Sequence, residues 1–406
     1  MKVVLLMWCI GGWHVKETET NRSFENNRYH CIIFNLIIMK IFQKSIVALH
    51  LVFAFASCSQ EVKHQVLELT EYDSISVDID YPYLSNYTRL KPIVRNGELY
   101  VVGYNHYEHY YDFINLSRGE HFSVKLQREG PDGVLTHGRF WVNEKGIVCQ
   151  THAGLVALDM QGKVQHRVPM EELLAPKEIY LARPRGSGLM NYDYAGSFES
   201  QCYIPLSPLK KDVDVAIGKV YDAETRSLEL LPVLYPEPVK ALFQVGSLTM
   251  PRINASDKDR IVYNFPYSSK VYQYDRRTKE VSMFDIQSQT IPNELDMSEF
   301  EMADGVKKDK NELTTSRFSW VHYSAEADRY YRVHYSGRKD FSDLEENRKR
   351  KIYLMVYDEK EQTTKEYLLP TQFSEIYFIH DDVLYFDFDG TNDDVLTFAK
   401  IDLRKL

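Results

Sequence analysis

The chain has 406 residues, 44% of them hydrophobic, so it can bury a large core in one big β domain or in two smaller domains. Its formal net charge is -9, and no Lys/Arg tract interleaves with aromatic residues along any expected strand. Proteins that bind nucleic acids present such basic surfaces, so we expect no nucleic-acid partner.

The first patterned segment precedes Cys58. Lysines lead into an apolar run at residues 45–55, and the small residues Ala56 and Ser57 stand directly before Cys58. This order is typical of a secretory signal. FASC at residues 55–58 resembles the lipobox of bacterial lipoproteins, which implies cleavage before Cys58 and lipid on its thiol and new amino group. An uncleaved signal anchor and a buried cysteine stay open as alternatives.

The lipobox interpretation makes Met39 the expected start, because Met39-Lys40 then places the basic segment where export needs it. Two later cysteines, Cys149 and Cys202, fall on comparable strands of neighbouring repeats, so a disulfide and two buried thiols both remain open. The expected division is a non-native upstream extension at 1–38, a lipoprotein signal peptide at 39–57, a polar tether at 58–73 and a folded domain at 74–406.

One phrase recurs along the folded domain: an apolar strand ending in Asp or Asn, a short charged turn, and a second strand. Hairpins recurring at intervals of several tens of residues are typical of β-propeller blades. We therefore predict an all-β propeller of six four-stranded blades. The six strand ends are Asn115, Asp159, Asp222, Asp275, Asp358 and Asp402.

The last repeat lacks a strand. It supplies three, at residues 375–379, 383–388 and 395–402, and would leave its outer edge unpaired. Residues 74–79 alternate polar and apolar side chains as a half-buried strand does, and they have no hairpin partner. We predict that residues 74–79 pair with residues 395–402 and close the ring.

The lipobox, the EGPDGV connector at residues 129–134 and the blade phrase together resemble uncharacterised Bacteroidetes lipoproteins with a domain of unknown function, a TolB-like or NHL-like six-bladed propeller. The resemblance covers the chain from Cys58 onward. It implies a lipid anchor in the outer membrane, with the periplasmic and the surface-exposed orientation both open. It implies no catalytic residue, since none is established in that family.

Two local motifs suggest chemistry that their context does not support. Residues 387–394 match the opening of haloacid-dehalogenase phosphatases, but too little chain follows for that α/β domain. Their aspartates could also form a calcium-binding loop, but their spacing lacks the EF-hand pattern. His106 and His109 would point to opposite faces of a strand, and only Glu108 stands near them as a third metal ligand. We interpret both as loops and expect no metal, no cofactor and no catalytic residue.

The long segments at residues 169–196, 207–217, 287–316 and 336–351 all belong to connections that open on one face of a propeller. We predict that a ligand or partner meets this face, with neutral loop variation as the alternative. Arg suits carboxylates, and Tyr stacks on sugars or peptides. The candidate binding residues are Arg183, Arg185, Tyr192 and Tyr194, with His137 and Arg139 at the entry to the second blade.

The function that we favour is a lipid-anchored, non-catalytic module of the cell envelope that binds a glycan, peptide or protein. The alternative is an envelope enzyme, a glycan lyase or hydrolase, with carboxylates and histidine on the same face. No Gly-x-Ser-x-Gly elbow, Walker loop or dinucleotide fingerprint is present, which weakens the enzyme hypothesis without excluding it.

Overall fold

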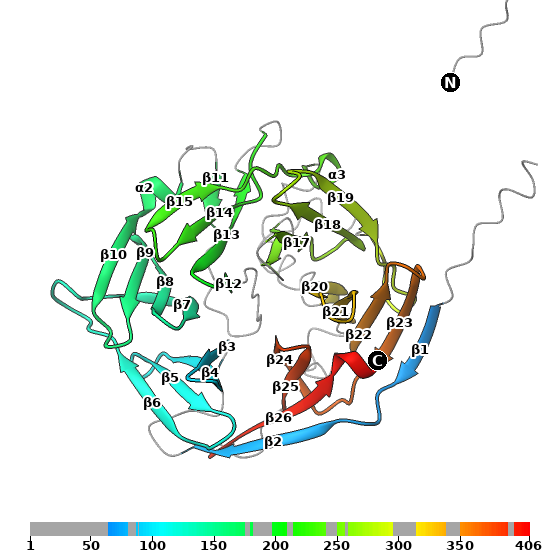
Figure 1. The fold of residues 1–406 in the computed structure, drawn as a ribbon, viewed down its shortest axis with the longest axis horizontal. Coiled ribbons are helices and arrows are strands. Elements are labelled where there is room, and N and C mark those ends of the chain that lie inside the picture. The colour runs from blue at the N-terminus through cyan, green and yellow to red at the C-terminus, as the bar shows by residue number, and fades with distance from the viewer. Residues whose placement is uncertain are drawn as a thin grey trace, which may run out of the picture. The chain divides into compact units, whose positions relative to one another are not determined.

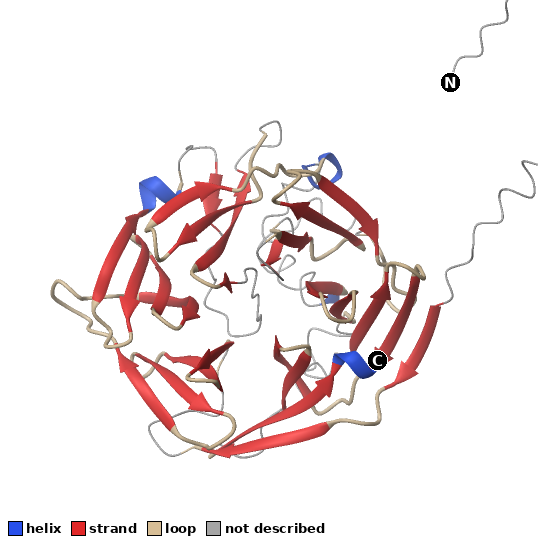
Figure 2. Cartoon of the chain, viewed as in Figure 1, coloured by secondary structure: helices blue, strands red, loops and turns tan. Residues whose placement is uncertain are grey.

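The computed structural model describes residues 64–79, 87, 89–174, 179–181, 197–208, 214–240, 250–255, 259–294, 314–337, 350–388 and 394–406. The chain divides into two compact units, Met1–Glu61 and Val62–Leu406, and all described residues belong to the second. Strands dominate the described residues of this unit, and its named helical elements are short (Figure 2). None of the helices in the described ranges is long and apolar enough to cross a membrane. Cys58 and the expected signal peptide lie outside the described residues.

Six sheets stand around a central axis, and in each blade the chain runs from the axis outward (Figure 1). The all-β, six-bladed prediction is confirmed. Blades one and two contain β3 (Leu90–Arg95), β4 (Glu98–Asn105), β5 (Tyr110–Asn115), β6 (His121–Lys125), β7 (Thr136–Asn143), β8 (Gly146–Thr151), β9 (Gly154–Asp159) and β10 (Val164–Pro169).

Blades three and four contain β11 (Ile179–Leu181), β12 (Ser197–Phe198), β13 (Gln201–Pro208), β14 (Gly218–Asp222), β15 (Ser227–Leu230), β16 (Arg252–Ala255), β17 (Arg260–Asn264), β18 (Lys270–Asp275) and β19 (Val281–Asp285). Blades five and six contain β20 (Arg317–Ser324), β21 (Arg329–Tyr335), β22 (Ile352–Asp358), β23 (Thr363–Leu368), β24 (Phe373–His380), β25 (Val383–Phe388) and β26 (Val395–Asp402). The short helical elements are α2 (Met170–Leu173), α3 (Glu237–Lys240) and η4 (Leu403–Lys405).

The N-terminal strand β2 (Asp73–Asp78) completes blade six. It pairs antiparallel with β26, in a register that runs from Asp73 opposite Lys400 to Asp78 opposite Val395. Val77 and Ile79 are buried, and they share a cluster with side chains of blade one and blade six. The predicted closure of the ring is therefore confirmed, and the alternation that predicted it is the alternation between solvent and this inter-blade core.

A further strand, β1 (His64–Glu68), lies on the outer edge of blade five, parallel to β23 (Figure 1). Residues 64–68 belong to the stretch that we expected to be a polar tether, and this part of the expectation is wrong. The physical reason is that Leu67 and Leu69 pack against a core cluster of blades five and six, while the backbone of β1 pairs the outer edge of β23.

The repeated Asp or Asn has a structural role at the end of the third strand of each blade. Its side-chain oxygen accepts hydrogen bonds from backbone N–H groups of the following turn: Asn115 accepts from Ser117 at 2.8 Å and from Arg118 at 3.0 Å. The equivalent bonds are made by Asp159, Asp222, Asp275 and Asp358, and Asp402 accepts from Arg404 at the start of η4. The phrase therefore recurs because blades one to five need the same turn after the third strand, and Asp402 of blade six caps η4 instead.

The expected surface insertion at residues 287–316 begins as part of the core. Ile291 is buried in the cluster between blades four and five. Thr290 Oγ1 lies 3.0 Å from His334 Nε2, and the Gln289 N–H donates to the buried Glu366 carboxylate at 2.9 Å. The expectation of a free insertion is therefore wrong for residues 287–294.

The two cysteines of the described residues, Cys149 and Cys202, are buried and free. Of the two alternatives that their positions left open, the pair of buried thiols is therefore the one observed.

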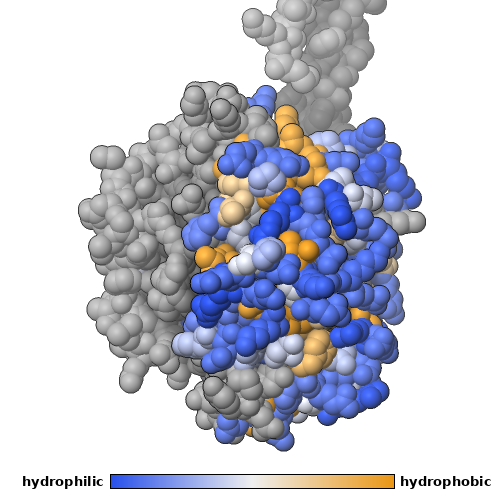
Figure 3. Space-filling view, turned by 90° about the vertical axis from the view of Figure 1, so that its left-hand side faces the viewer, coloured by the Kyte–Doolittle hydropathy of each residue, from blue (hydrophilic) through white to orange (hydrophobic). Residues whose placement is uncertain are grey.

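The outer strands face solvent and are polar on that side, as in β6 and β10. The coloured part of the side seen in Figure 3 is accordingly mostly hydrophilic, with separate hydrophobic spots.

Candidate functional site

The strand connections distinguish two faces of the ring. We call the turn face the one at which strands 1 and 2, and strands 3 and 4, of a blade are joined; the insertion face carries the other connections. On the turn face only residues 359–362 separate β22 from β23, whereas on the insertion face residues 336–351 separate β21 from β22. The predicted asymmetry therefore holds for these strand boundaries, and it directs attention to the insertion face.

The innermost strand of blade three is split into two pieces. Both β11 and β12 pair antiparallel with β13, β11 with residues 206–208 and β12 with residues 201–202. The intervening residues 182–196 carry Arg183, Arg185, Tyr192 and Tyr194, which lie outside the described residues. We expected the whole of residues 169–196 to connect two blades; β11 corrects this, because residues 179–181 already pair with β13.

Pro205 marks this interruption in the sequence. It lies in β13 between the two paired stretches, opposite Gly218 of β14. Leu206 donates its N–H to Ile217 O at 3.0 Å, on the β14 side. Because N–H groups alternate along a strand, a donor at position 205 would point to the inner edge, where β11 ends and β12 has not begun. Proline has no such donor and is tolerated where a ladder is broken.

The other two candidate residues lie on β7, the innermost strand of blade two. The side chain of His137 is not among those that the structure describes. Arg139 is 3% exposed, and its Nη1 donates to Gln150 Oε1 on β8 at 3.1 Å. The guanidinium is therefore buried and bonded to a neighbouring strand of blade two.

The histidines of the turn between β4 and β5 differ from each other. His109 is buried, with Nδ1 2.8 Å from Tyr104 Oη and Nε2 2.7 Å from Val134 O, and burial lowers the pKa of its ring. Both nitrogens are engaged, so His109 fixes the turn. His106 is exposed. The described residues contain no group of three or more His, Cys, Asp or Glu side chains that could hold a metal ion.

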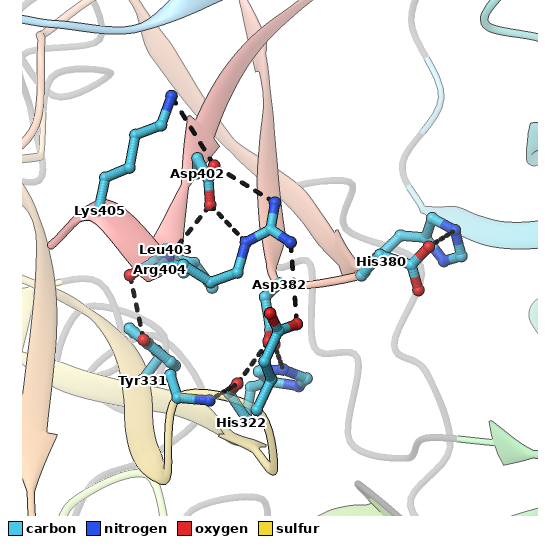
Figure 4. Close-up of polar contacts among 12 residues, drawn as sticks. His322, Tyr331, His380, Asp382, Asp402, Leu403, Arg404 and Lys405 are labelled. Carbon is cyan, nitrogen blue, oxygen red and sulfur yellow. Dashed lines mark hydrogen bonds and ion pairs between the residues drawn. The ribbon is translucent and has the colours of Figure 1, made fainter.

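A polar cluster that the sequence did not predict joins blades five and six at the turn face (Figure 4). His322 Nε2 lies 3.0 Å from Asp382 Oδ1, and Ser324 Oγ donates to the other oxygen of the same carboxylate. The bond to His322 is the largest cause that lowers the Asp382 pKa. His380 lies to one side, next to Asp381.

This cluster contains Ser, His and Asp, but their arrangement is not a nucleophilic relay. In a relay the serine hydroxyl bonds to the histidine, whereas here Ser324 and His322 both bond to Asp382. Arg404 of η4 reaches Glu326 at 3.8 Å, and Tyr331 donates to Leu403 O at 3.0 Å, so the C-terminal turn ties blade six to blade five. We interpret the cluster as an inter-blade contact.

Among solved structures, one with a TM-score above 0.5 supports the fold, and two others show weaker similarity. A structure of a DUF4221 family member from Bacteroides vulgatus has a TM-score of 0.61 and 14% identity, over 82% of this chain and 97% of that chain. A Bacteroides fragilis protein, described as exported, gives 0.49 and 10%, over 83% and 99%. The calcium-binding protein regucalcin from Agrobacterium tumefaciens gives 0.42 and 12%, over 83% and 96%. None of the curated proteins matches this chain.

The family follows from the sequence profile that matches the chain. DUF4221, a domain of unknown function, matches residues 67–368, from β1 to the end of β23. This span covers most of the ring, and the similar structure from Bacteroides vulgatus belongs to the same family. The chain is therefore a member of the DUF4221 family.

Proposed function

We propose that this protein is a lipid-anchored propeller of the cell envelope that binds a glycan, peptide or protein through its insertion face, without catalysis of its own. The observation that carries the proposal is the split innermost strand of blade three, between β11 and β12. The first strands of blades two, five and six are irregular in their pairing as well, but each of them is one continuous strand. An insertion retained at that position is a reasonable place for function, because binding residues concentrate on loops held by a rigid scaffold.

The chemistry of the insertion supports the same proposal. Residues 182–196 contain two arginines and two tyrosines, Arg183, Arg185, Tyr192 and Tyr194. Arg pairs with carboxylates through a planar fork, and Tyr offers a flat apolar face with a polar tip. Arginine and tyrosine side chains together favour the binding of a flat or anionic ligand over the cleavage of a bond.

Binding is tested with arrays of glycans and peptides. We expect the chain from residue 59 onward to bind members of one array, and a variant with residues 183–195 replaced by a short Gly-Ser linker to lose this binding. The control replaces the turn-face residues 359–362 by a linker of matched length and should bind normally. Equal binding by the two variants would contradict the proposal, and shortened glycan products in wild-type incubations would contradict its non-catalytic part.

The lipid anchor is tested separately. Stable attachment needs both a thioether lipid and an amide lipid, so Cys58→Ala should abolish labelling by a fatty-acid analogue and release the protein from membranes. Cys149→Ala changes a buried thiol and serves as the control. Labelling of the Cys58→Ala variant at the wild-type level would rule out the anchor.

A further inference from the structure

An exposed aromatic surface lies on the insertion face at blades one and two. Tyr107 is 70% exposed and Leu135 is 62% exposed, and His106 and Arg128 are exposed beside them in sequence. We call these four residues the Tyr107 surface. Tyr107 belongs to the turn between β4 and β5, and Leu135 to the connector between β6 and β7. The two segments adjoin, because His109 Nε2 of the turn lies 2.7 Å from Val134 O of the connector.

The turn that carries Tyr107 is held firmly. Asn105 Oδ1 accepts from the N–H groups of Tyr107 at 3.1 Å and Glu108 at 3.2 Å. His109 adopts a φ of 65°, a backbone conformation that is uncommon outside glycine, and its carbonyl accepts from the Leu126 N–H at 3.0 Å. The turn is therefore fixed on the side away from solvent, and the Tyr107 ring is displayed on its other side.

The connector that carries Leu135 is fixed as well, and it contains the EGPDGV motif. Arg167 of β10 donates to Pro131 O at 3.1 Å and to Gly133 O at 2.9 Å. The Val164 N–H donates to Asp132 Oδ1 at 3.1 Å. The motif thus attaches the connector to blade two, and the backbone on both sides of the Tyr107 surface is anchored before any ligand arrives, which lowers the entropy cost of binding.

A cation accompanies the aromatic rings. Arg128 Nη2 lies 3.4 Å from Tyr107 O, and the His106 and Tyr107 ring centroids are 3.9 Å apart. After burial, the positive charge of Arg128 is among the causes that lower the pKa of His109. Since the whole chain carries a formal net charge of -9, a local cation is what an anionic ligand would need here.

We propose that the Tyr107 surface binds an acidic oligosaccharide: the apolar face of one sugar ring stacks on Tyr107, and a carboxylate pairs with Arg128. Four side chains bounded by polar residues offer far less than the roughly 800 Å² per partner of a stable protein interface. A sugar needs only one flat ring and a few polar groups, and a uronic acid adds the anion that Arg recognises. This inference rests on the proposed function and assigns a ligand class to a second part of the same face.

The test uses a panel of trisaccharides of galacturonic, mannuronic and glucuronic acid, each with its neutral hexose counterpart, titrated by calorimetry. We expect at least one acidic trisaccharide to bind. Tyr107→Ala should weaken it by about tenfold or more, and Arg128→Gln should weaken the acidic probe by about tenfold while sparing the neutral one. Met283→Ala, which removes another exposed apolar side chain on β19, is the control and should bind as the wild type does.

Several outcomes would overturn the inference: no acidic trisaccharide bound at millimolar concentration, equal loss in the Met283→Ala control, or binding of a glutamate-rich peptide in place of every sugar. The variant with residues 183–195 replaced separates this inference from the proposed function. Acidic sugar binding that survives in that variant but is lost in Tyr107→Ala supports the Tyr107 surface alone. If the variant with residues 183–195 replaced loses array binding and Tyr107→Ala keeps it, the result supports the proposed function and rejects the Tyr107 surface.

Discussion

The two N-terminal strands make an instructive comparison, because each joins a blade built from residues hundreds of positions later. β2 pairs antiparallel with β26 and is the fourth strand of blade six, whereas β1 pairs parallel with β23 and is a fifth strand of blade five. Val77 of β2 is 3% exposed, and Val66 of β1 is 45% exposed. A strand that supplies an inter-blade face is part of the ring, and a strand added to a complete blade mainly covers its edge.

Truncation should give the largest difference in the free energy of unfolding between loss of β1 and loss of β2. A chain beginning at residue 70 lacks β1, and one beginning at residue 80 lacks both. The second loses the buried contacts of Ile75, Val77 and Ile79, and we expect its free energy of unfolding to fall by roughly 5 kcal/mol or more, a large part of the stability of a typical domain. Removing β1 alone should cost about 2 kcal/mol through Leu67 and Leu69.

Urea unfolding followed by circular dichroism measures both truncations. The comparison requires a cooperative transition in the chain from residue 70 and a weakened or absent one in the chain from residue 80. Equal midpoints for the two truncations would mean that β2 does not close the ring.

Replacing a valine by alanine in each strand should give the next largest difference in the free energy of unfolding. Val77→Ala removes two buried methyl groups from the core between blades one and six and should cost about 2 kcal/mol. Val66→Ala acts on an exposed side chain and should change the free energy of unfolding by less than about 0.5 kcal/mol. Thermal melts of the two variants compare them directly; a larger loss in Val66→Ala would reverse our assignment of the two strands.

The connector from β2 to blade one adds a pH-dependent contact. Tyr87 donates to the buried Asp112 at 2.6 Å, and burial raises the pKa of Asp112 from 3.8 to about 6. The folded state therefore holds this proton more tightly than the unfolded state, and the contribution of Asp112 to stability is lost as pH rises from 3.8 through 6. Relative to Asp112→Asn, the wild type should lose stability across this window.

Unfolding midpoints at pH 4.5 and 7 measure this loss, with Asp73→Asn on the exposed side of β2 as the control. A difference between wild type and Asp112→Asn that is independent of pH would show that Asp112 does not titrate in this range.

The smallest effect should come from the exposed side of the closing pair. Ser76 Oγ and Thr397 Oγ1 are 3.0 Å apart in an exposed position, where water replaces the bond when it is lost. Ser76→Ala should therefore change the free energy of unfolding by less than about 0.5 kcal/mol. A loss close to that of Val77→Ala would mean that polar pairing, and not the buried face of β2, holds the ring closed.

Alternation and turn chemistry made most of the fold predictable from the sequence. β2 was found because its side chains alternate over a full strand, and the blades because each third strand ends in an Asp or Asn that bonds to the next turn. β1 was missed because it is short, follows a polar stretch and pairs with a strand some three hundred residues later. The division of β11 from β12 in blade three was not predicted, because each strand is too short to show a period.

Candidate sites were less predictable because they depend on residues that are distant in sequence. His322 and Asp382 belong to different blades, and no local motif joins them; the one signal was the Asp381-Asp382 hairpin, where both residues have positive φ. Tyr107 has no sequence motif of its own, and it stands between histidines that suggest a metal site. The sequence shows which residues are aromatic, but their exposure depends on how the turn folds. Tyr107 is exposed, whereas Tyr104 is partly buried.

The pairing of β2 with β26 also sets an order for biosynthesis. Ser76 and Thr397 are 321 positions apart, so β2 leaves the ribosome among the first residues of the domain and waits for nearly the whole chain before its partner exists. Closing so long a loop is slow, and folding rates fall as contacts become more distant in sequence. The last blade therefore lacks its fourth strand until synthesis is nearly complete, and the ring stays open during that time.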